Sequence, residues 1–129
     1  MHSFKVITCI VLLLAVIFAF SSYTNRVLST TSQDIANHVD EIEKTIKEGN
    51  WDKTEEQLQT IESNWDKTEK KWTVLIDHFE IDNIDISLSR MSKYIEAKEQ
   101  ALALAEAGVL KNLIEHIPDR ETLTLKNIF

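Results

Sequence analysis

Residues that break regular secondary structure are almost missing from this chain of 129 residues, which contains two glycines and one proline. These three residues are Gly49, Gly108 and Pro118. A sheet-rich fold needs turn signals about every ten residues, and the sequence has none at that spacing. Because glutamate, lysine, leucine, isoleucine and alanine are abundant instead, the sequence predicts an all-α protein. Its length is enough for one domain.

The N-terminal segment from Phe4 to Tyr23 is predominantly apolar and carries a single charge, on Lys5. A helix rises about 1.5 Å per residue, so a helix of this length crosses the ~30 Å hydrocarbon core of a bilayer. We therefore predict that residues 1–23 form a transmembrane or signal-anchor helix, which crosses the membrane through residues 4–23. Residues 24–129 then form an extracytoplasmic domain.

The orientation of the apolar segment depends on few charges. Lys5 and the α-amine lie at its N-terminal end, and Arg26 is the only nearby base that follows it. The positive-inside tendency therefore favours a cytoplasmic N-terminus in the cell membrane. The alternative is a secreted protein, because Ala19-Phe20-Ser21 also fits the small-residue rule for cleavage near Ser21. Both interpretations export the rest of the chain.

The sequence NWDKTE occurs twice, at residues 50–55 and 64–69. Fourteen helical residues at about 100° each return to within about 40° of the starting direction, so both copies face the same way. We interpret them as two registers of one amphipathic helix, and a duplicated binding motif is the alternative. Three tryptophans lie on the resulting stripe, which Phe79 would continue. We expect a buried core role for them and keep partner binding as the alternative: Trp51, Trp65 and Trp72.

Two further apolar stripes indicate additional helices. The first ends at Gly49, where Asn50 is a suitable N-cap for the next helix, and it consists of Ile35, Val39, Ile42 and Ile46. The second consists of Ile81, Ile84, Leu88, Met91, Ile95, Leu102, Ala105, Val109 and Leu113. We expect Pro118 to end the last helix and the apolar tail, residues 122–129, to pack on the bundle. The predicted fold is an N-terminal transmembrane or signal-anchor helix followed by an antiparallel bundle of three to four helices.

Charge and missing motifs exclude several classes of function. Only Lys5 of the 14 basic residues precedes residue 25, and all 21 acidic residues follow it, so residues 24–129 carry a formal charge of −8. An acidic surface of this kind repels nucleic acid, and we predict no nucleic-acid partner. The sequence has no phosphate-binding loop, no Gly-x-Ser-x-Gly and no His-Glu-x-x-His. We therefore predict no catalytic residue, no cofactor and no enzymatic activity.

One cluster has the residue types of a metal site. His78, Asp82 and Asp85 fall within about 60° of each other on a helix, and His116 would join them if the last helix folds back. The resulting hypothesis is a sensor that binds a divalent cation or a small ligand. A structural polar layer or a solvated acidic patch is the favoured interpretation, because metal sites in bundles typically use Glu-x-x-His pairs, which are absent here.

The order of these features resembles an uncharacterised family, a domain of unknown function. The resemblance rests on the N-terminal apolar segment, the spaced tryptophans, LIDHFEIDNIDISLSRMSKYI at residues 75–95, HIP at residues 116–118 and LKNIF at residues 125–129. The family comprises small single-span membrane-anchored helical proteins of spore-forming Gram-positive bacteria. The resemblance implies a location in the bacterial envelope and a multi-pass membrane protein as partner, and it assigns no catalytic residues.

Together these observations predict a membrane-anchored helical protein that acts by protein–protein interaction at the outer face of a bacterial membrane. The expected partner is a membrane protein. The oligomeric state is left open by the sequence.

Overall fold

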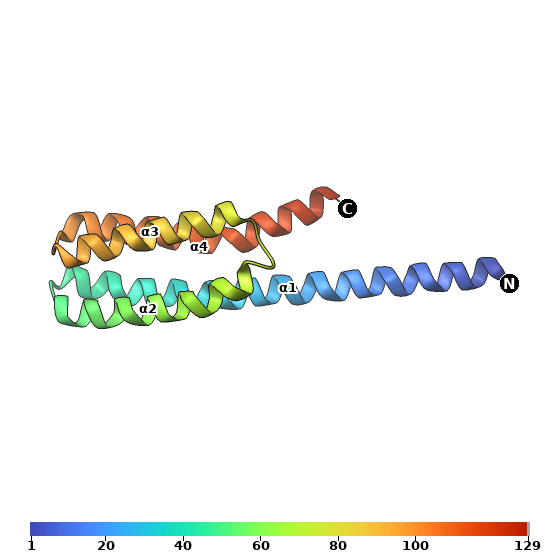
Figure 1. The fold of residues 1–129 in the computed structure, drawn as a ribbon, viewed down its shortest axis with the longest axis horizontal. Helices are drawn as coiled ribbons and strands as arrows, with labels where there is room; N and C mark the ends of the chain where they lie inside the picture. Colours follow the sequence, from blue (N-terminus) through green and yellow to red (C-terminus); the bar gives the residue numbers. More distant parts are fainter. Residues whose placement is uncertain (129) are drawn as a thin grey trace.

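The computed structural model describes the backbone of residues 1–128 and the side chains of residues 1–118. The described residues form four helices and no strand. The helices are α1 (His2–Lys47), α2 (Trp51–Trp72), α3 (His78–Glu96) and α4 (Gln100–Ile128). They run alternately up and down side by side, and the N-terminal half of α1 extends far beyond the other three (Figure 1). The predicted fold class is therefore confirmed, with four helices in the bundle.

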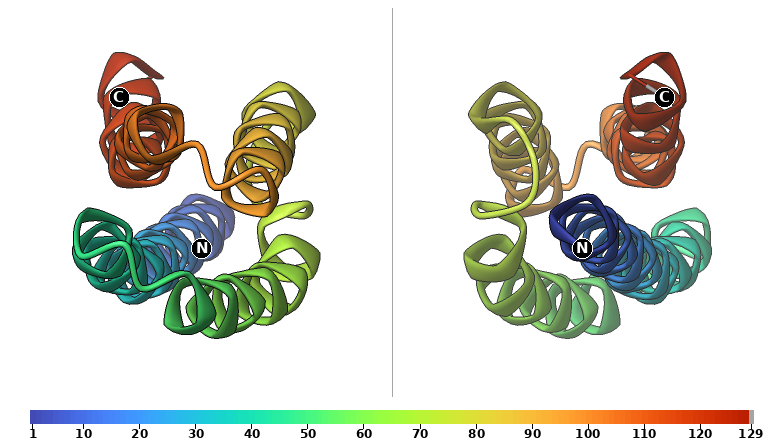
Figure 2. Two further views of the ribbon diagram at one scale, coloured as in Figure 1. Left: turned by 90° about the vertical axis from the view of Figure 1, so that its left-hand side faces the viewer. Right: turned by 90° about the vertical axis from the view of Figure 1, so that its right-hand side faces the viewer.

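Each helix packs on two neighbours around one core. α1 packs on α2 and α4, and α3 packs closely on α4 but only lightly on α2. The end-on views show the four helices arranged around a common centre (Figure 2). Burial of apolar surface stabilises the bundle by about 25 cal/mol per Å². The largest fully buried side chains come from all four helices and are Trp72, Leu28, Ile35, Ile42, Ile46, Ile61, Ile84, Met91, Ile95, Leu110, Ile114 and Ile117.

The corner between α1 and α2 follows the sequence prediction. α1 ends at Lys47, and Gly49 adopts a φ of +70°, a left-handed conformation that glycine takes at low cost. Asn50 then caps α2, because its side chain accepts a hydrogen bond from the backbone N–H of Lys53 at 3.3 Å. As predicted, α2 continues through Asn64 without a break.

The helix ends before Phe79, which corrects the expectation that Phe79 continues the tryptophan stripe. α2 ends at Trp72, and α3 starts at His78 after a short loop. Asp77 caps α3 by accepting a hydrogen bond from the backbone N–H of Phe79 at 3.2 Å. Phe79 therefore belongs to a different helix, where its side chain is 67% exposed.

The core face of α4 also differs from the prediction. Its buried apolar residues are Ala103, Ala107, Leu110, Ile114 and Ile117, whereas Leu102, Ala105 and Val109 of the predicted stripe are exposed. Both sets have helical spacing, so periodicity alone does not choose between them. α4 also continues through Pro118 to Ile128. A proline removes one backbone hydrogen bond, and the residues after it donate their own. The tail, residues 122–129, lies outside the described side chains.

α1 is one continuous helix that contains both the apolar segment and the first helix of the bundle. Its 46 residues are helical without a break, so the expected boundary between residues 23 and 24 falls inside the helix. The apolar side chains between Phe4 and Phe20 are exposed, and the first fully buried residue of the core is Leu28. Among the described residues, α1 alone is long and apolar enough to cross a membrane, a criterion that a signal sequence also meets.

Candidate functional site

The acidic cluster predicted as a metal site lies at the start of α3. His78 and Asp82 are exposed, and Asp85 is half-buried. Asp85 is already engaged, because its Oδ1 accepts a hydrogen bond from Trp65 Nε1 at 2.6 Å. His116 is exposed on α4. Among the side chains that the structure describes, no group of three or more His, Cys, Asp or Glu residues is arranged to hold a metal ion. The metal hypothesis therefore gains no support from this geometry.

Glu69 joins Asp85 across the seam between α2 and α3. Burial raises the pKa of Glu69 above the ordinary glutamate value of 4.5, and the negative charge of Asp85 and a side-chain hydrogen bond with Asp85 raise it further. A neighbouring negative charge disfavours the ionised form of a carboxyl group, here that of Glu69. Sequence reasoning missed Glu69, although its position one turn after Trp65 on the same face of α2 was a usable signal. The pair belongs to a structural polar layer with Trp65.

The tryptophan stripe is mainly part of the core. Trp65 and Trp72 are 2% and 0% exposed, and their rings meet edge to face with centroids 5.6 Å apart. Both indole N–H groups have acceptors, since Trp72 Nε1 donates to Thr31 Oγ1 at 2.8 Å and Trp65 donates to Asp85. Trp51 is half-buried and packs against the core. A partner of the folded bundle therefore has little access to Trp65 and Trp72.

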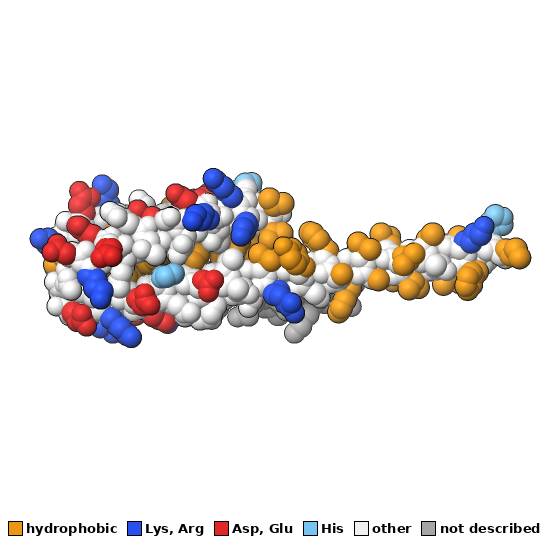
Figure 3. All heavy atoms as spheres, turned by 90° about the horizontal axis from the view of Figure 1, so that it is seen from below, with side chains coloured by type: hydrophobic (Ala, Val, Ile, Leu, Met, Phe, Trp, Pro, Cys, Tyr) orange, Lys and Arg blue, Asp and Glu red, His pale blue; other side chains and the backbone are white. Residues whose placement is uncertain are grey.

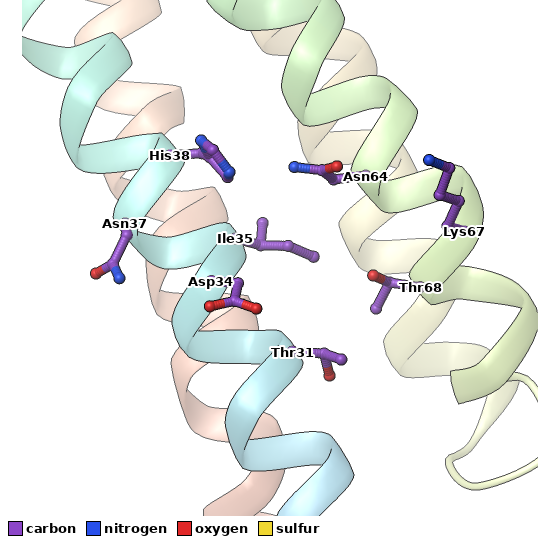
Figure 4. Close-up of a pocket in the computed structure, with 8 residues that line it drawn as sticks. All are labelled: Thr31, Asp34, Ile35, Asn37, His38, Asn64, Lys67 and Thr68. Atoms are coloured by element: carbon purple, nitrogen blue, oxygen red, sulfur yellow. The ribbon is translucent and has the colours of Figure 1, made fainter.

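A polar groove of about 380 Å³ opens between α1 and α2. Its walls carry both charges and several neutral hydrogen-bonding groups, from Thr31, Asp34, Ile35, Asn37, His38, Asn64, Lys67 and Thr68. His38 and Asn64 point toward each other across it, and Ile35 lies between the two helices (Figure 4). Sequence reasoning missed the groove because its two walls are far apart in the chain.

The two copies of NWDKTE occupy different surroundings. In the first copy, Asn50 caps α2, and Thr54 Oγ1 is 2.9 Å from Thr45 Oγ1 in a buried contact between α1 and α2. In the second copy, Asn64 and Lys67 line the open groove. The copies therefore do not form two equivalent sites. This difference supports the interpretation of the repeat as two registers of one amphipathic helix.

The outer face of α4 carries apolar side chains that are exposed to solvent. Leu102 and Val109 are 48% and 46% exposed, and Ala105 lies between them on the same side of the helix. We call these three residues the outer α4 face. Ala101 and Asn112 beside it are uncharged and exposed, and Glu106, one turn after Leu102, lies 3.9 Å from Arg90 of α3. The domain has a formal charge of −8, and the face of the bundle seen in Figure 3 carries many charged side chains of both signs.

The match to known families covers all of the bundle. Residues 22–128 match the family described as a domain of unknown function, DUF4363. The matched range starts near the end of the apolar segment and includes α2, α3 and α4. Comparisons with curated proteins and with solved structures found no match.

Proposed function

We propose that this chain, which belongs to the DUF4363 family of unknown function, is a membrane-anchored helical domain that binds another membrane protein. The domain stands on the outer face of the membrane, and α1 holds it there. It acts by contact alone and has no catalytic step. The family match supports an independent helical domain that begins where the apolar segment ends.

The outer α4 face is the observation that carries this proposal. α4 buries one apolar face in the core and leaves a second one, Leu102, Ala105 and Val109, in contact with water. The cores of protein interfaces are depleted in charged residues, and this face is uncharged on an otherwise acidic domain. An exposed apolar surface with a polar surround is typical of a binding site for another protein.

The position of the face along α1 constrains the partner. Lys111 Nζ contacts Asp40 Oδ1 at 2.6 Å, which places Val109 beside the part of α1 near Ile42. At about 1.5 Å per residue, that point is roughly 25–30 Å beyond Tyr23, where the apolar segment ends. The partner therefore needs an extracytoplasmic part of at least this height. A membrane protein with short loops alone would not reach the face.

Site-specific photocrosslinking in native membranes tests the proposal. A photoreactive amino acid replaces Val109 in the full chain, and the matched control carries it at Gln59, an exposed position on α2. We expect a crosslink to a second membrane protein from residue 109 and none from residue 59. The added substitution Leu102→Glu should abolish the crosslink, because it places a charge on the outer α4 face.

Two results would contradict the proposal. One is the same set of crosslinked products from residues 59 and 109, which would show random collisions. The other is a crosslink from residue 109 to a second copy of this chain alone. The mass of the protein recovered from the membrane fraction separately tests the anchor, since removal of the segment near Ser21 would release the domain.

A further inference from the structure

We propose that the loop between α2 and α3, residues 73–77, and the adjoining Phe79 rest on the lipid surface of the bilayer that holds α1. We call this part of the chain the membrane-facing tip. The inference rests on the anchoring part of the proposed function. It adds a second contact with lipid, made by the folded bundle itself and separate from the outer α4 face.

The membrane-facing tip exposes large apolar side chains on a hydrogen-bonded turn. Val74 is 84% exposed and Phe79 is 67% exposed, the two highest values for large apolar side chains outside α1 among the described residues. The turn is held by backbone hydrogen bonds, since the N–H groups of Leu75 and Ile76 both donate to the carbonyl of Trp72, at 2.9 and 2.8 Å. Ile76 is buried in the core. The fold thus fixes Val74 and Phe79 in contact with solvent.

The tip lies at the end of the bundle from which the apolar half of α1 emerges (Figure 1). The hydrogen bond from Trp72 to Thr31 sets the end of α2 beside Thr31, and the loop continues from there toward the apolar segment. Thr31 is eight residues beyond Tyr23, or about 12 Å along the helix. The headgroup layer adds roughly 5–8 Å to each side of the hydrocarbon core. The loop extends from Trp72 toward the apolar segment (Figure 1), which brings the membrane-facing tip toward the headgroup layer.

Exposed apolar side chains gather at this end of the bundle, next to basic ones (Figure 3). Lys70 and Lys71 are exposed in the last turn of α2, and Arg26 is exposed on α1 just after the apolar segment. Basic side chains beside apolar ones suit the boundary between phosphate groups and acyl chains. The nearest acid on the loop, Asp77, already accepts the hydrogen bond that caps α3.

The acidic charge of the whole domain does not prevent this contact. A free domain with a formal charge of −8 would stay away from an anionic membrane. α1 instead holds the tip at the surface, so the contact is intramolecular and has a high effective concentration. Apolar contact with the headgroup layer of the bilayer then needs no net attraction between the domain and the membrane.

Fluorescence of a single label in pure lipid vesicles tests the lipid contact. The full chain with Cys9→Ser carries one new cysteine, from Val74→Cys, labelled with the environment-sensitive dye NBD. The control has the dye at Asp52→Cys, an exposed position at the opposite end of the bundle. A third protein carries the dye at the native Cys9, within the apolar segment, and reports insertion. Phosphatidylcholine vesicles are prepared with and without lipid that bears a nitroxide near the headgroup.

We expect the dye at residue 74 to emit at shorter wavelength than the dye at residue 52, and to lose intensity in nitroxide vesicles. Phe79→Cys should behave like Val74→Cys. Because the vesicles contain only this protein and lipid, quenching by the nitroxide reports contact with lipid and not with a partner. Val74 and Phe79 are outside the core, so the substitutions leave the fold intact, which circular dichroism of each labelled protein verifies.

Each other outcome overturns the inference in a recognisable way. Quenching at residue 9 with water-like emission at residue 74 would show an anchored domain whose tip does not touch lipid. Equal quenching at residues 52 and 74 would show a bundle lying on its side. No quenching at residue 9 would overturn the anchor itself, and with it the lipid contact.

Discussion

Replacing Thr31 with valine removes the acceptor that satisfies a buried tryptophan. Thr31 Oγ1 accepts a hydrogen bond from Trp72 Nε1 at 2.8 Å, and Trp72 is 0% exposed. Valine has nearly the same shape as threonine, so the change leaves the indole N–H buried without a partner. An unsatisfied buried donor costs about 1–3 kcal/mol. We expect Thr31→Val to lower the free energy of unfolding by this amount.

Unfolding of the full chain in mild detergent, followed by circular dichroism at increasing temperature or urea concentration, measures the loss. For a domain of this size, each 1 kcal/mol corresponds to roughly 4–8 °C in Tm. Thr60→Val is the matched control, because Thr60 is exposed and its hydroxyl donates only to the carbonyl of Glu56, at 3.3 Å. That variant should change stability by less than about 0.5 kcal/mol.

A double-mutant cycle isolates the hydrogen bond from the other effects of the substitution. In the background of Trp72→Phe no donor remains, so Thr31→Val should cost little there. A loss of equal size in both backgrounds would refute the reasoning. So would a Thr31→Val protein no less stable than Thr60→Val.

The remaining predictions concern single positions whose local geometry decides whether a substitution raises or lowers stability. Gly49→Ala should destabilise the protein by about 1 kcal/mol, because Gly49 has a φ of +70°. Gly108→Ala should stabilise it by about 0.5–1 kcal/mol, because an added Cβ in α4 meets nothing within 4 Å. Tm changes of the same sign in the two variants would contradict this contrast. Asn50→Ala should cost about 1 kcal/mol by removing the cap of α2, measured by the same unfolding assay. Glu69→Gln should raise Tm at neutral pH, since the folded state holds the ionised Glu69 carboxylate at a disadvantage. Because the pKa of Glu69 is raised in the folded state, its contribution to stability is complete below pH 4.5 and is lost as pH rises through the folded-state pKa. The higher Tm of the Glu69→Gln variant should therefore vanish on acidification. A Tm difference unchanged from pH 7 to pH 4 would contradict the raised pKa of Glu69.

Local signals in the sequence predicted the elements whose ends are set by their own residues. Gly49 and Asn50 marked the corner between α1 and α2, because a left-handed residue and a side-chain cap are properties of single positions. The regular spacing of Ile81, Ile84 and Leu88 likewise identified the buried face of α3. These features need no knowledge of the neighbouring helices.

Features that depend on neighbours were not predictable in the same way. α4 has two apolar faces with equivalent spacing, and only the positions of α1 and α3 decide that Leu110 is buried and Val109 exposed. The carboxyl pair of Glu69 and Asp85 and the groove beside His38 each combine residues from two helices. The expectation that Pro118 ends the last helix was wrong, because a proline costs a helix one hydrogen bond and a local clash, and α4 continues in spite of this cost.

The unbroken course of α1 makes the domain mechanically continuous with the membrane anchor that we propose. About 36 Å of the same rod separate Tyr23 from the α1–α2 corner, at about 1.5 Å per residue. Membrane helices lean by roughly 20° on average, and a lean of that size displaces the corner sideways by about 12 Å. A change in bilayer thickness alters the lean, and the rigid rod converts it into a sweep of the far end. Rotation of the apolar half of α1 about the helix axis turns the whole bundle by the same angle, because the helix has no break between the two parts.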